Sequence, residues 1–383
     1  MQQIAERMNQ IHFSGIRTIL ERVKRLEQEG APVIHLEIGC PDFDTPEHIK
    51  RAGCRALDNG HVHYTSNYGI LPLRKAIARK LKSDNHLVFD PRSEIIVTAG
   101  VSEGIMMTMM ALLNPGDEVL IPEPLFPSYV MAARMAGAIP VAAPVCAENE
   151  YQPTRAGFEA QLSKRTRMIV VITPVNPTGT VLSESTLQDL ADFSIENDLL
   201  VMADEIYEKL IYDNRRHISI AGLPGMRSRT ITLNGFSKSY AMTGWRLGYI
   251  AAEARLIQPL VRIHQYTVVC ANSFAQWGGV AALEGPQLGV QAMVEELNQR
   301  RLFVTEQLRH IPRLSFPPPQ GALYVYVDVS GMAQNAYQLA DDLLEQVHVA
   351  VVPWDHRHIR ISYGNSYENL KVALERMSQA FAG

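Results

Sequence analysis

The sequence has little cysteine, no long apolar run and no excess of charge of one sign. Its four cysteines stand far apart without a CxxC pair, so their spacing indicates neither a zinc site nor a disulfide framework. No apolar run approaches the roughly 18 residues of a transmembrane helix, and no membrane span is expected. The net charge of −4 supplies no broad positive surface, which argues against nucleic acid as a partner.

Two phosphate-binding signatures are also missing. The chain contains neither GxGxxG nor GxxxxGK[ST], so we expect neither a dinucleotide-binding fingerprint nor a P-loop. The first fifteen residues lack the apolar core of a secretory signal peptide. Four scattered thiols suit a reducing compartment, and we therefore expect a cytoplasmic protein.

The sequence does contain an alternation of strand-like and helix-like segments. The β-branched runs are 94–98, 118–121, 168–173, 199–203 and 230–233; the helical stretches are 15–29, 102–113, 126–137, 184–197 and 272–284. This alternation predicts an α/β fold with a largely parallel sheet. Several of the runs are apolar throughout, which is typical of strands covered on both faces. The last hundred residues differ: a long helical stretch over 286–310 and alternating aromatics near 324–328 predict a separate α+β unit.

Several polar residues follow the predicted strands, where the ligand crevice of an α/β protein lies. Asn176 follows one strand, Asp204 and Tyr207 follow the next, and Lys238 and Arg246 follow the run at 230–233. Taken singly, each has an ordinary interpretation: a turn asparagine, an N-capping aspartate, a solvated lysine. The small-residue turn TAGVSEGI (98–105) also leads from a strand into a helix, where backbone N–H groups can bind an anion.

Taken together, these motifs resemble the pyridoxal-phosphate (PLP) aminotransferases of fold type I, the class I/II group. The resemblance extends from LEIGCPDFDTPEHI (36–49) to HIRIS (358–362) and includes, in order, YTSNYGILPLRKAIA, PGDEVLIPEPLFPSY, NPTGT, ADEIYE and SKSYAMTGWRLGY. It implies a large PLP-binding domain (46–285) with a mainly parallel seven-stranded sheet flanked by helices. Residues 1–45 and 286–383 would form the smaller α+β domain.

The resemblance assigns three residues to catalysis. Lys238 would form a Schiff base with the cofactor aldehyde and later move a proton from the substrate Cα to C4′ of the cofactor. Asp204 would pair with the pyridinium nitrogen and keep the ring protonated. Tyr207, together with Asn176, would hydrogen-bond the phenolic oxygen. Phe126 would stack on the pyridine ring.

The remaining assignments concern the phosphate and the substrate. Arg246 supplies a guanidinium for the phosphate, and further donors would come from Val101, Ser102 and Ser237. Tyr64 would reach the phosphate of a neighbouring subunit, which implies a homodimer with shared active sites. Arg360 would bind the substrate α-carboxylate, with Gly39 and Asn176 beside the substrate. No metal is expected. Arg357 and the histidines His348, His356 and His358 lie near Arg360 in the sequence, and we interpret the histidines as solvated or structural.

The chain departs from the family pattern in three ways. VAVVPWDHRHIRIS runs almost directly from strand to strand, whereas most relatives have a longer loop there that covers the substrate side chain. This leaves a more open or differently walled pocket, in which Trp354 could fill the space. Gly235 replaces a serine three residues before Lys238, so one phosphate hydroxyl could be missing. No second Arg or Lys stands ready for a distal carboxylate, and aspartate specificity is therefore not supported.

Three functions are compatible with these features. The first is an aminotransferase that moves an amino group between an L-amino acid and a 2-oxo acid by a ping-pong mechanism. The second is a PLP enzyme on the same scaffold that catalyses elimination, cyclisation or oxidation, since cofactor motifs do not separate these reactions. The third is a binding or regulatory protein, which the retained Lys238, Asp204 and Arg246 and the lack of a DNA-binding extension argue against.

Overall fold

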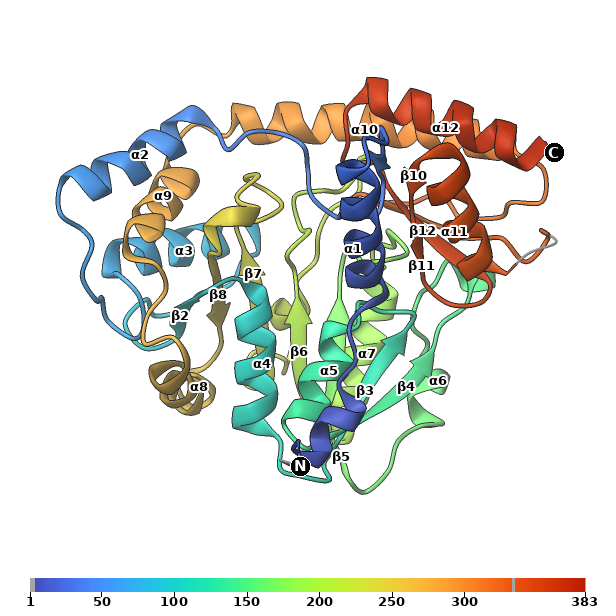
Figure 1. Ribbon diagram of the computed structural model, residues 1–383. Helices are drawn as coiled ribbons and strands as arrows, with labels where there is room; N and C mark the ends of the chain where they lie inside the picture. Colours follow the sequence, from blue (N-terminus) through green and yellow to red (C-terminus); the bar gives the residue numbers. More distant parts are fainter. Residues whose placement is uncertain (1–3, 333–334, 383) are drawn as a thin grey trace.

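The central feature of the fold is a seven-stranded sheet with the strand order β2-β8-β7-β6-β5-β3-β4 (Figure 1). A computed structural model describes residues 4–332 and 335–382. Neighbouring strands pair in parallel except at β8, which runs antiparallel to both β2 and β7. The predicted α/β class with a mainly parallel sheet is therefore confirmed.

The elements of this part of the chain have the following bounds. The strands are β2 (Ile95–Thr98), β3 (Glu118–Glu123), β4 (Ile139–Pro144), β5 (Thr166–Ile172), β6 (Leu200–Asp204), β7 (Thr230–Gly235) and β8 (Gly248–Ala251). The helices are α2 (Glu47–Asp58), α3 (Leu71–Asp84), α4 (Val101–Leu112), α5 (Ser128–Met135), α6 (Arg155–Glu159), α7 (Glu184–Glu196), α8 (Ala254–Thr267) and α9 (Ser273–Glu284). Short 3₁₀ turns are η2 (Ala147–Asn149), η3 (Ile220–Gly222) and η4 (Thr243–Trp245).

A second group of elements comes from the two ends of the chain. It comprises η1 (Glu6–Gln10), α1 (Gly15–Gln28), β1 (Ile34–His35), α10 (Leu288–Arg309), β9 (Tyr324–Asp328), α11 (Ala336–Val347), β10 (Val349–Ala350), β11 (Val352–Pro353), β12 (His358–Ser362) and α12 (Tyr367–Ala382). β11, β12 and β9 form an antiparallel sheet, and β1 pairs in parallel with β10. The long helices α10 and α12 run side by side along one edge of the molecule (Figure 1).

Capping side chains fix where several helices begin. Ser14 accepts a hydrogen bond from the Arg17 backbone N–H at the start of α1, and Asn272 does the same for Ala275 at the start of α9. Such caps satisfy N–H groups that have no partner inside the helix. The α1 pattern predicted over 15–29 ends as expected, because Gly30 adopts a positive φ of 90° directly after the C-cap.

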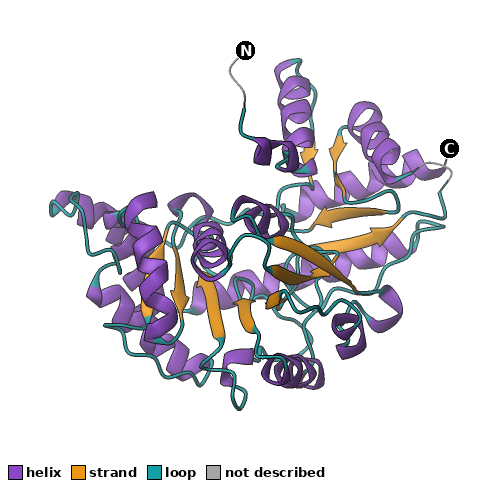
Figure 2. Cartoon of the chain, turned by 90° about the horizontal axis from the view of Figure 1, so that it is seen from below, coloured by secondary structure: helices purple, strands orange, loops and turns teal. Residues whose placement is uncertain are grey.

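Apart from the edge strand β4, the strands of the large sheet are buried along almost their whole length, because helices cover both faces (Figure 2). α4 packs against both α5 and α8 in front of the sheet in the view of Figure 1. Burial on both faces explains why β5 and β6 have largely continuous rather than alternating apolar patterns. No helix among the described residues is long and apolar enough to cross a bilayer.

The strand register brings distant segments to one edge of the sheet. Ile172 at the end of β5 pairs with Asp204 at the end of β6, which in turn pairs with Leu233 in β7. On the far side of β7, Gly248 at the start of β8 pairs with Gly235 and with Thr98 at the end of β2. The segments that follow these strand ends therefore surround one space.

Candidate active site

A cavity of about 360 Å³ opens at this edge of the sheet. Its lining contains all but one of the site residues expected from the sequence: Gly39, Val101, Ser102, Phe126, Asn176, Asp204, Tyr207, Ser237, Lys238, Arg246 and Arg360. They come from eight separate segments of the chain. A larger hollow of about 1090 Å³ between α3, α10 and the segment 209–215 contains none of them.

Lys238 extends into the cavity from the turn after β7. Its Nζ donates a hydrogen bond to the backbone carbonyl of Gly39 and lies 5.8 Å from the centre of the Tyr207 ring. Gly39 has to be a glycine, because a Cβ at this position would overlap the hydroxyl of Tyr324. The amine is thus held at the junction between the large sheet and the N-terminal segment, and no carboxylate among the described residues pairs with it.

Asp204 ends β6 at the bottom of the cavity and is only 3 % exposed. One carboxylate oxygen accepts a hydrogen bond from the Tyr129 hydroxyl (2.6 Å), and the other accepts one from the Ile206 backbone N–H (2.9 Å). Burial raises the pKa of Asp204 to about 6, although the Tyr129 hydrogen bond lowers it. The carboxyl group is thus held in place and is costly to ionise until a cation approaches it.

An anion-binding end of the cavity forms where α4 begins. Gly100 caps this helix with a φ of 82°, and a Cβ there would come within 2.6 Å of the Arg246 guanidinium. Gly248 lies against the same turn, since a Cβ on it would come within 2.8 Å of the Val101 backbone nitrogen. The two glycines therefore allow the guanidinium and the first N–H groups of α4 to meet. Ser102 and Ser237 line the same cavity.

Arg360 forms the opposite wall from β12. It is 1 % exposed; Nη1 donates to the Asn176 side-chain oxygen (3.0 Å), and Nη2 donates to the Glu37 carbonyl. Its guanidinium carbon lies 4.4 Å from the centre of the Tyr324 ring, and its Nε has no hydrogen-bond partner in the described part of the chain. A buried cation with an unpaired donor and no carboxylate partner is suited to bind a carboxylate ligand.

These groups match the chemical parts of PLP. The phosphate needs N–H donors and a cation, which the start of α4 and Arg246 provide; the ring nitrogen needs a carboxylate, which Asp204 provides. The aldehyde needs a primary amine, which Lys238 provides. The glycine-lined turn at Gly100 and Gly248, which any larger residue would fill, marks the phosphate end. The residues present therefore fit the cofactor.

Comparison with known proteins agrees with this chemistry. The sequence model described as "Aminotransferase class I and II" matches residues 31–377. An aspartate aminotransferase of Musicola paradisiaca is 40 % identical over 99 % of this chain and 97 % of its own length. Aromatic-amino-acid aminotransferase 2 of Thermococcus litoralis is 38 % identical over 98 % of this chain and 97 % of its own length. The crystal structure of an aspartate aminotransferase from Rhizobium meliloti superposes with a TM-score of 0.96, covering 100 % of this chain and 99 % of that one at 35 % identity.

The chain belongs to the class I and II aminotransferases. It is accordingly a PLP-dependent enzyme of fold type I that transfers an amino group between an amino acid and a 2-oxo acid. Elimination, cyclisation and oxidation, the alternatives left open by the sequence, receive no support from these comparisons. The roles of individual residues are not tested by them and stay predictions.

Tyr64 is the one predicted site residue that lies outside the cavity. It belongs to the segment between α2 and α3 and is 84 % exposed. It borders a separate surface hollow of about 470 Å³ together with residues that precede α9, such as Cys270. Within one chain of the aminotransferase Tyr64 therefore cannot line the cavity, which is compatible with the predicted contact to a second subunit.

The rival residues near Arg360 have structural partners. Arg357 is exposed and pairs with Asp328 (2.9 Å). His358 stacks on Tyr326, with ring centres 4.5 Å apart, and pairs with Asp355 at 2.9 Å. Arg357 and His358 are therefore held by contacts within and beside the sheet of β9 and β12, and neither lines the cavity.

Two of the departures from the family pattern can be followed in the structure. β11 and β12 are joined by only four residues, 354–357, so the connection is short as predicted. Trp354 contacts Arg360, with 5.6 Å between its ring centre and the guanidinium carbon, but it lines the neighbouring hollow and not the cavity. The expectation that Trp354 could fill the substrate pocket therefore stays a prediction. At Gly235 a Cβ would lie 3.0 Å from the Leu247 carbonyl oxygen, so a serine would be crowded.

Sequence reasoning missed several residues of the cavity. Tyr129 follows Phe126 by three residues within the same motif, and in the helix expected over 126–137 this spacing places both side chains on one face. Tyr324 begins the aromatic alternation of β9, and its hydroxyl lies 2.7 Å from that of Tyr207. Ile16 and Leu20 of α1 also reach the cavity. Their helical spacing had indicated only a packed face, since no local signal shows what a helix packs against.

Proposed function

We propose that this aminotransferase holds PLP between Asp204, Arg246 and Lys238 and binds the amino-acid carboxylate at Arg360. The observation that carries the proposal is the single cavity in which the buried carboxyl group, the free amine, the anion-binding turn and the buried guanidinium meet. When bound, PLP supplies an electron sink for the electrons released at the substrate Cα. The two parts of the chain, 46–285 and the flanking segments 1–45 and 286–383, would then enclose the cofactor between them.

Each residue contributes a defined interaction. Lys238 Nζ would hold the cofactor through its aldehyde and, once displaced by substrate, would accept the Cα proton and later release it. The Asp204 carboxylate would hold the proton on the ring nitrogen, because a buried carboxylate is stabilised by an adjacent cation. Tyr207 and Asn176 donate hydrogen bonds to the phenolic oxygen, and Phe126 covers the ring. Ser237, together with the Val101 and Ser102 N–H groups, completes the phosphate site.

We infer that the amino donor carries an apolar or aromatic side chain. The cationic residues in the cavity lining are Lys238, Arg246 and Arg360, and each is already assigned to the cofactor or to the α-carboxylate. Ile16, Leu20 and Ile38 also line the cavity, and they favour an apolar side chain. The related enzymes named for aspartate and for aromatic amino acids show that the family includes both substrate classes.

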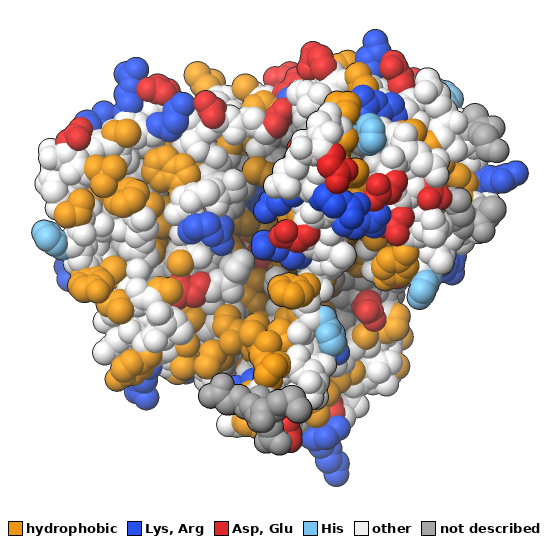
Figure 3. Space-filling model, viewed as in Figure 1, with side chains coloured by type: hydrophobic (Ala, Val, Ile, Leu, Met, Phe, Trp, Pro, Cys, Tyr) orange, Lys and Arg blue, Asp and Glu red, His pale blue; other side chains and the backbone are white. Residues whose placement is uncertain are grey.

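A homodimer is the proposed working form. Tyr64, Val62 and Tyr266 are large apolar or aromatic side chains that are 84 %, 56 % and 86 % exposed. Val62 and Tyr64 border the same surface hollow, and exposed apolar groups of this type are typical of protein contacts. Figure 3 shows further hydrophobic side chains gathered across the lower part of the visible face, whereas charged side chains crowd its upper right, over α1 and α11. Four free cysteines support the cytoplasm as the compartment.

The test is a half-reaction without an amino acceptor. The purified enzyme, saturated with PLP, is mixed with single L-amino acids, and the 2-oxo acid is measured. We expect about one equivalent of 2-oxo acid per active site, most rapidly from aromatic or large apolar donors. The Lys238→Ala variant should fold but should release no 2-oxo acid. Ammonia released over many turnovers would instead assign the enzyme to elimination chemistry, and a preference for aspartate would overturn the proposed donor class.

A further inference from the structure

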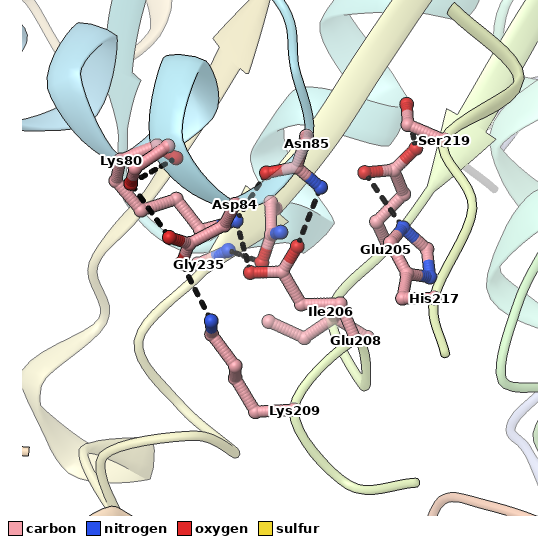
Figure 4. A network of polar contacts seen from close by, with 12 residues as sticks. Lys80, Asp84, Asn85, Glu205, Ile206, Glu208, Lys209, His217, Ser219 and Gly235 are labelled. Atoms are coloured by element: carbon pink, nitrogen blue, oxygen red, sulfur yellow. Dashed lines mark hydrogen bonds and ion pairs between the residues drawn. The ribbon is translucent and has the colours of Figure 1, made fainter. Parts of the chain in front are cut away.

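The ADEIYE motif (203–208) has two sides. Asp204 and Tyr207 line the cavity, whereas Glu205 and Glu208 do not. Figure 4 shows Glu205 beside Ser219 and His217, and Glu208 beside Asn85. Behind the cavity the two glutamates meet His217, which comes from the loop that leads to η3. The aminotransferase reaction uses none of these three side chains. The cluster is nevertheless buried, since Glu205 and Glu208 are 1 % and 8 % exposed.

The atoms of this cluster face one another. One ligand atom from each of Glu205, Glu208 and His217 lies within 4.8 Å of the others. His217 Nε2 is 3.1 Å from Glu205 Oε2, and the histidine side chain is 9 % exposed. Both ring nitrogens of His217 and Oε2 of Glu205 lack a hydrogen-bond partner in the described part of the chain. Nε2 has only this ion-pair contact with Glu205, and Nδ1 has neither a hydrogen bond nor an ion pair among the described residues, which is unusual for a buried imidazole and indicates a missing partner.

The outer sides of the two carboxylates are already held in place. Ser219 Oγ donates to Glu205 Oε1, and Asn85 Nδ2 donates to Glu208 Oε2 at 3.0 Å. Lys80, from α3, forms an ion pair with Glu208 Oε1 and donates to Asn85 Oδ1 at 2.8 Å. Such outer hydrogen bonds orient metal ligands in known sites.

We propose that Glu205, Glu208 and His217 bind one divalent transition-metal ion, Zn²⁺. Two carboxylate oxygens and one imidazole nitrogen suit Zn²⁺, which is usually four-coordinate, and water would take the fourth position. Bonds of about 2.0–2.2 Å require the ligand atoms to approach to roughly 3.5 Å, which small side-chain rotations can achieve from the present spacing. The competing arrangement has no metal, and His217 then simply pairs with Glu205.

The position of the site gives the ion a structural role. Glu205 and Glu208 flank Ile206 and Tyr207, and Asp204 directly precedes them. A metal bound here would tie the loop containing His217 to the turn that orients Asp204 and Tyr207 in the cavity. Metal binding to the folded state alone also stabilises that state. The site therefore predicts stabilisation by Zn²⁺ without direct participation in amino transfer.

The experiment measures zinc binding by the untagged, PLP-loaded enzyme. Metal-stripped protein is dialysed against buffered ZnCl₂, bound zinc is quantified, and the unfolding temperature is recorded. We expect one zinc per chain and a higher unfolding temperature. His217→Gln and Glu205→Gln should each weaken binding by about tenfold or more and abolish the thermal shift. His310→Ala, which removes an exposed histidine, should bind zinc like the wild type.

Two results would overturn the site. One is no zinc bound by the wild type; the other is zinc bound equally by the wild type and both variants, which would place the ion elsewhere. Unchanged PLP absorbance and unfolding temperature without metal establish that each variant is folded. If the variants do not fold, anomalous diffraction from zinc-soaked wild-type crystals decides the question: a peak between the three side chains supports the site, and its absence refutes it. These readouts do not depend on amino-transfer activity.

Discussion

At the residue scale, Asp204 shows that a site residue can lower the stability of the folded protein. The side chain is buried and its pKa is raised to about 6, so at neutral pH the folded protein contains a buried carboxylate without a cation beside it. A rise of this size corresponds to roughly 3 kcal/mol of lost stability at neutral pH. Binding of a protonated ring nitrogen would remove this cost, which links cofactor binding to stability.

Replacing this carboxyl group should therefore stabilise the empty enzyme. An asparagine side chain at this position cannot ionise, and its amide can keep the contacts to Tyr129 and Ile206. We expect cofactor-free Asp204→Asn to unfold a few degrees above the cofactor-free wild type at pH 7.5, and amino transfer to be lost. Because a raised carboxyl pKa costs stability only above the unfolded-state value, the difference should shrink as the pH falls from 6 toward 4. An equal or lower unfolding temperature at pH 7.5 would contradict this account.

Tyr324 makes two separable contacts, one through its hydroxyl and one through its ring. The hydroxyl bonds Tyr207, and the ring lies under the Arg360 guanidinium. Tyr324→Phe removes the first contact only, and we expect kcat to fall about fivefold, the value of one hydrogen bond, with little change in KM. Tyr324→Leu also removes the ring, and KM for the amino acid should rise as well. Equal kinetic effects of both changes would show that the two contacts do not act separately.

At the element scale, α1 is tied to the rest of the molecule by a histidine bridge. His35 in β1 contacts Glu37 (2.7 Å) through Nδ1 and Glu27 of α1 (3.0 Å) through Nε2. The Glu37 hydrogen bond is the main cause that raises the pKa of His35 to about 9. The protonated imidazole thus joins the helix that carries Ile16 and Leu20 into the cavity to the strand beside it.

Because of this bridge, the free energy of unfolding should decrease at alkaline pH. A raised histidine pKa stabilises the folded state fully below about pH 6.5, and this contribution is lost as the pH rises through about 9. We expect His35→Gln to unfold a degree or two below the wild type at pH 6.5, with the difference closing by pH 10. Differential scanning calorimetry over this range checks it. A difference that is constant with pH would show that the lost contribution is packing rather than charge.

The elements predicted correctly from the sequence are those with strong local signals. The runs at 168–173 and 230–233 were evident because β5 and β7 are buried and β-branched. The sequence did not indicate β8. This strand has only four residues, and its pairing with two antiparallel neighbours, rather than a local hydrophobic pattern, makes it a strand. The candidate site follows the same rule. Residues at strand ends were found, whereas Tyr324 and Leu20 reach the cavity through tertiary packing that no local pattern encodes.

At the scale of the whole molecule, the open question is whether two chains share each active site. Tyr64 lies outside its own chain's cavity, yet the family resemblance assigns it to a cofactor phosphate. Both statements hold if Tyr64 contacts the cofactor phosphate in the active site of the partner subunit. An exposed aromatic residue that functions only in a neighbouring subunit would make the dimer a requirement for catalysis rather than a storage form.

Mixed dimers test this arrangement directly. Lys238→Ala removes the amine and Tyr64→Ala removes the proposed phosphate contact, and each variant alone should be inactive or strongly impaired. After the two are unfolded and refolded together, half of the randomly assembled dimers are mixed. If Tyr64 acts in the partner, each mixed dimer contains one intact site, and activity should rise toward about a quarter of the wild-type value. If Tyr64 acts within its own chain, no site regains both residues and mixing yields no gain. Refolding each variant with itself is the control.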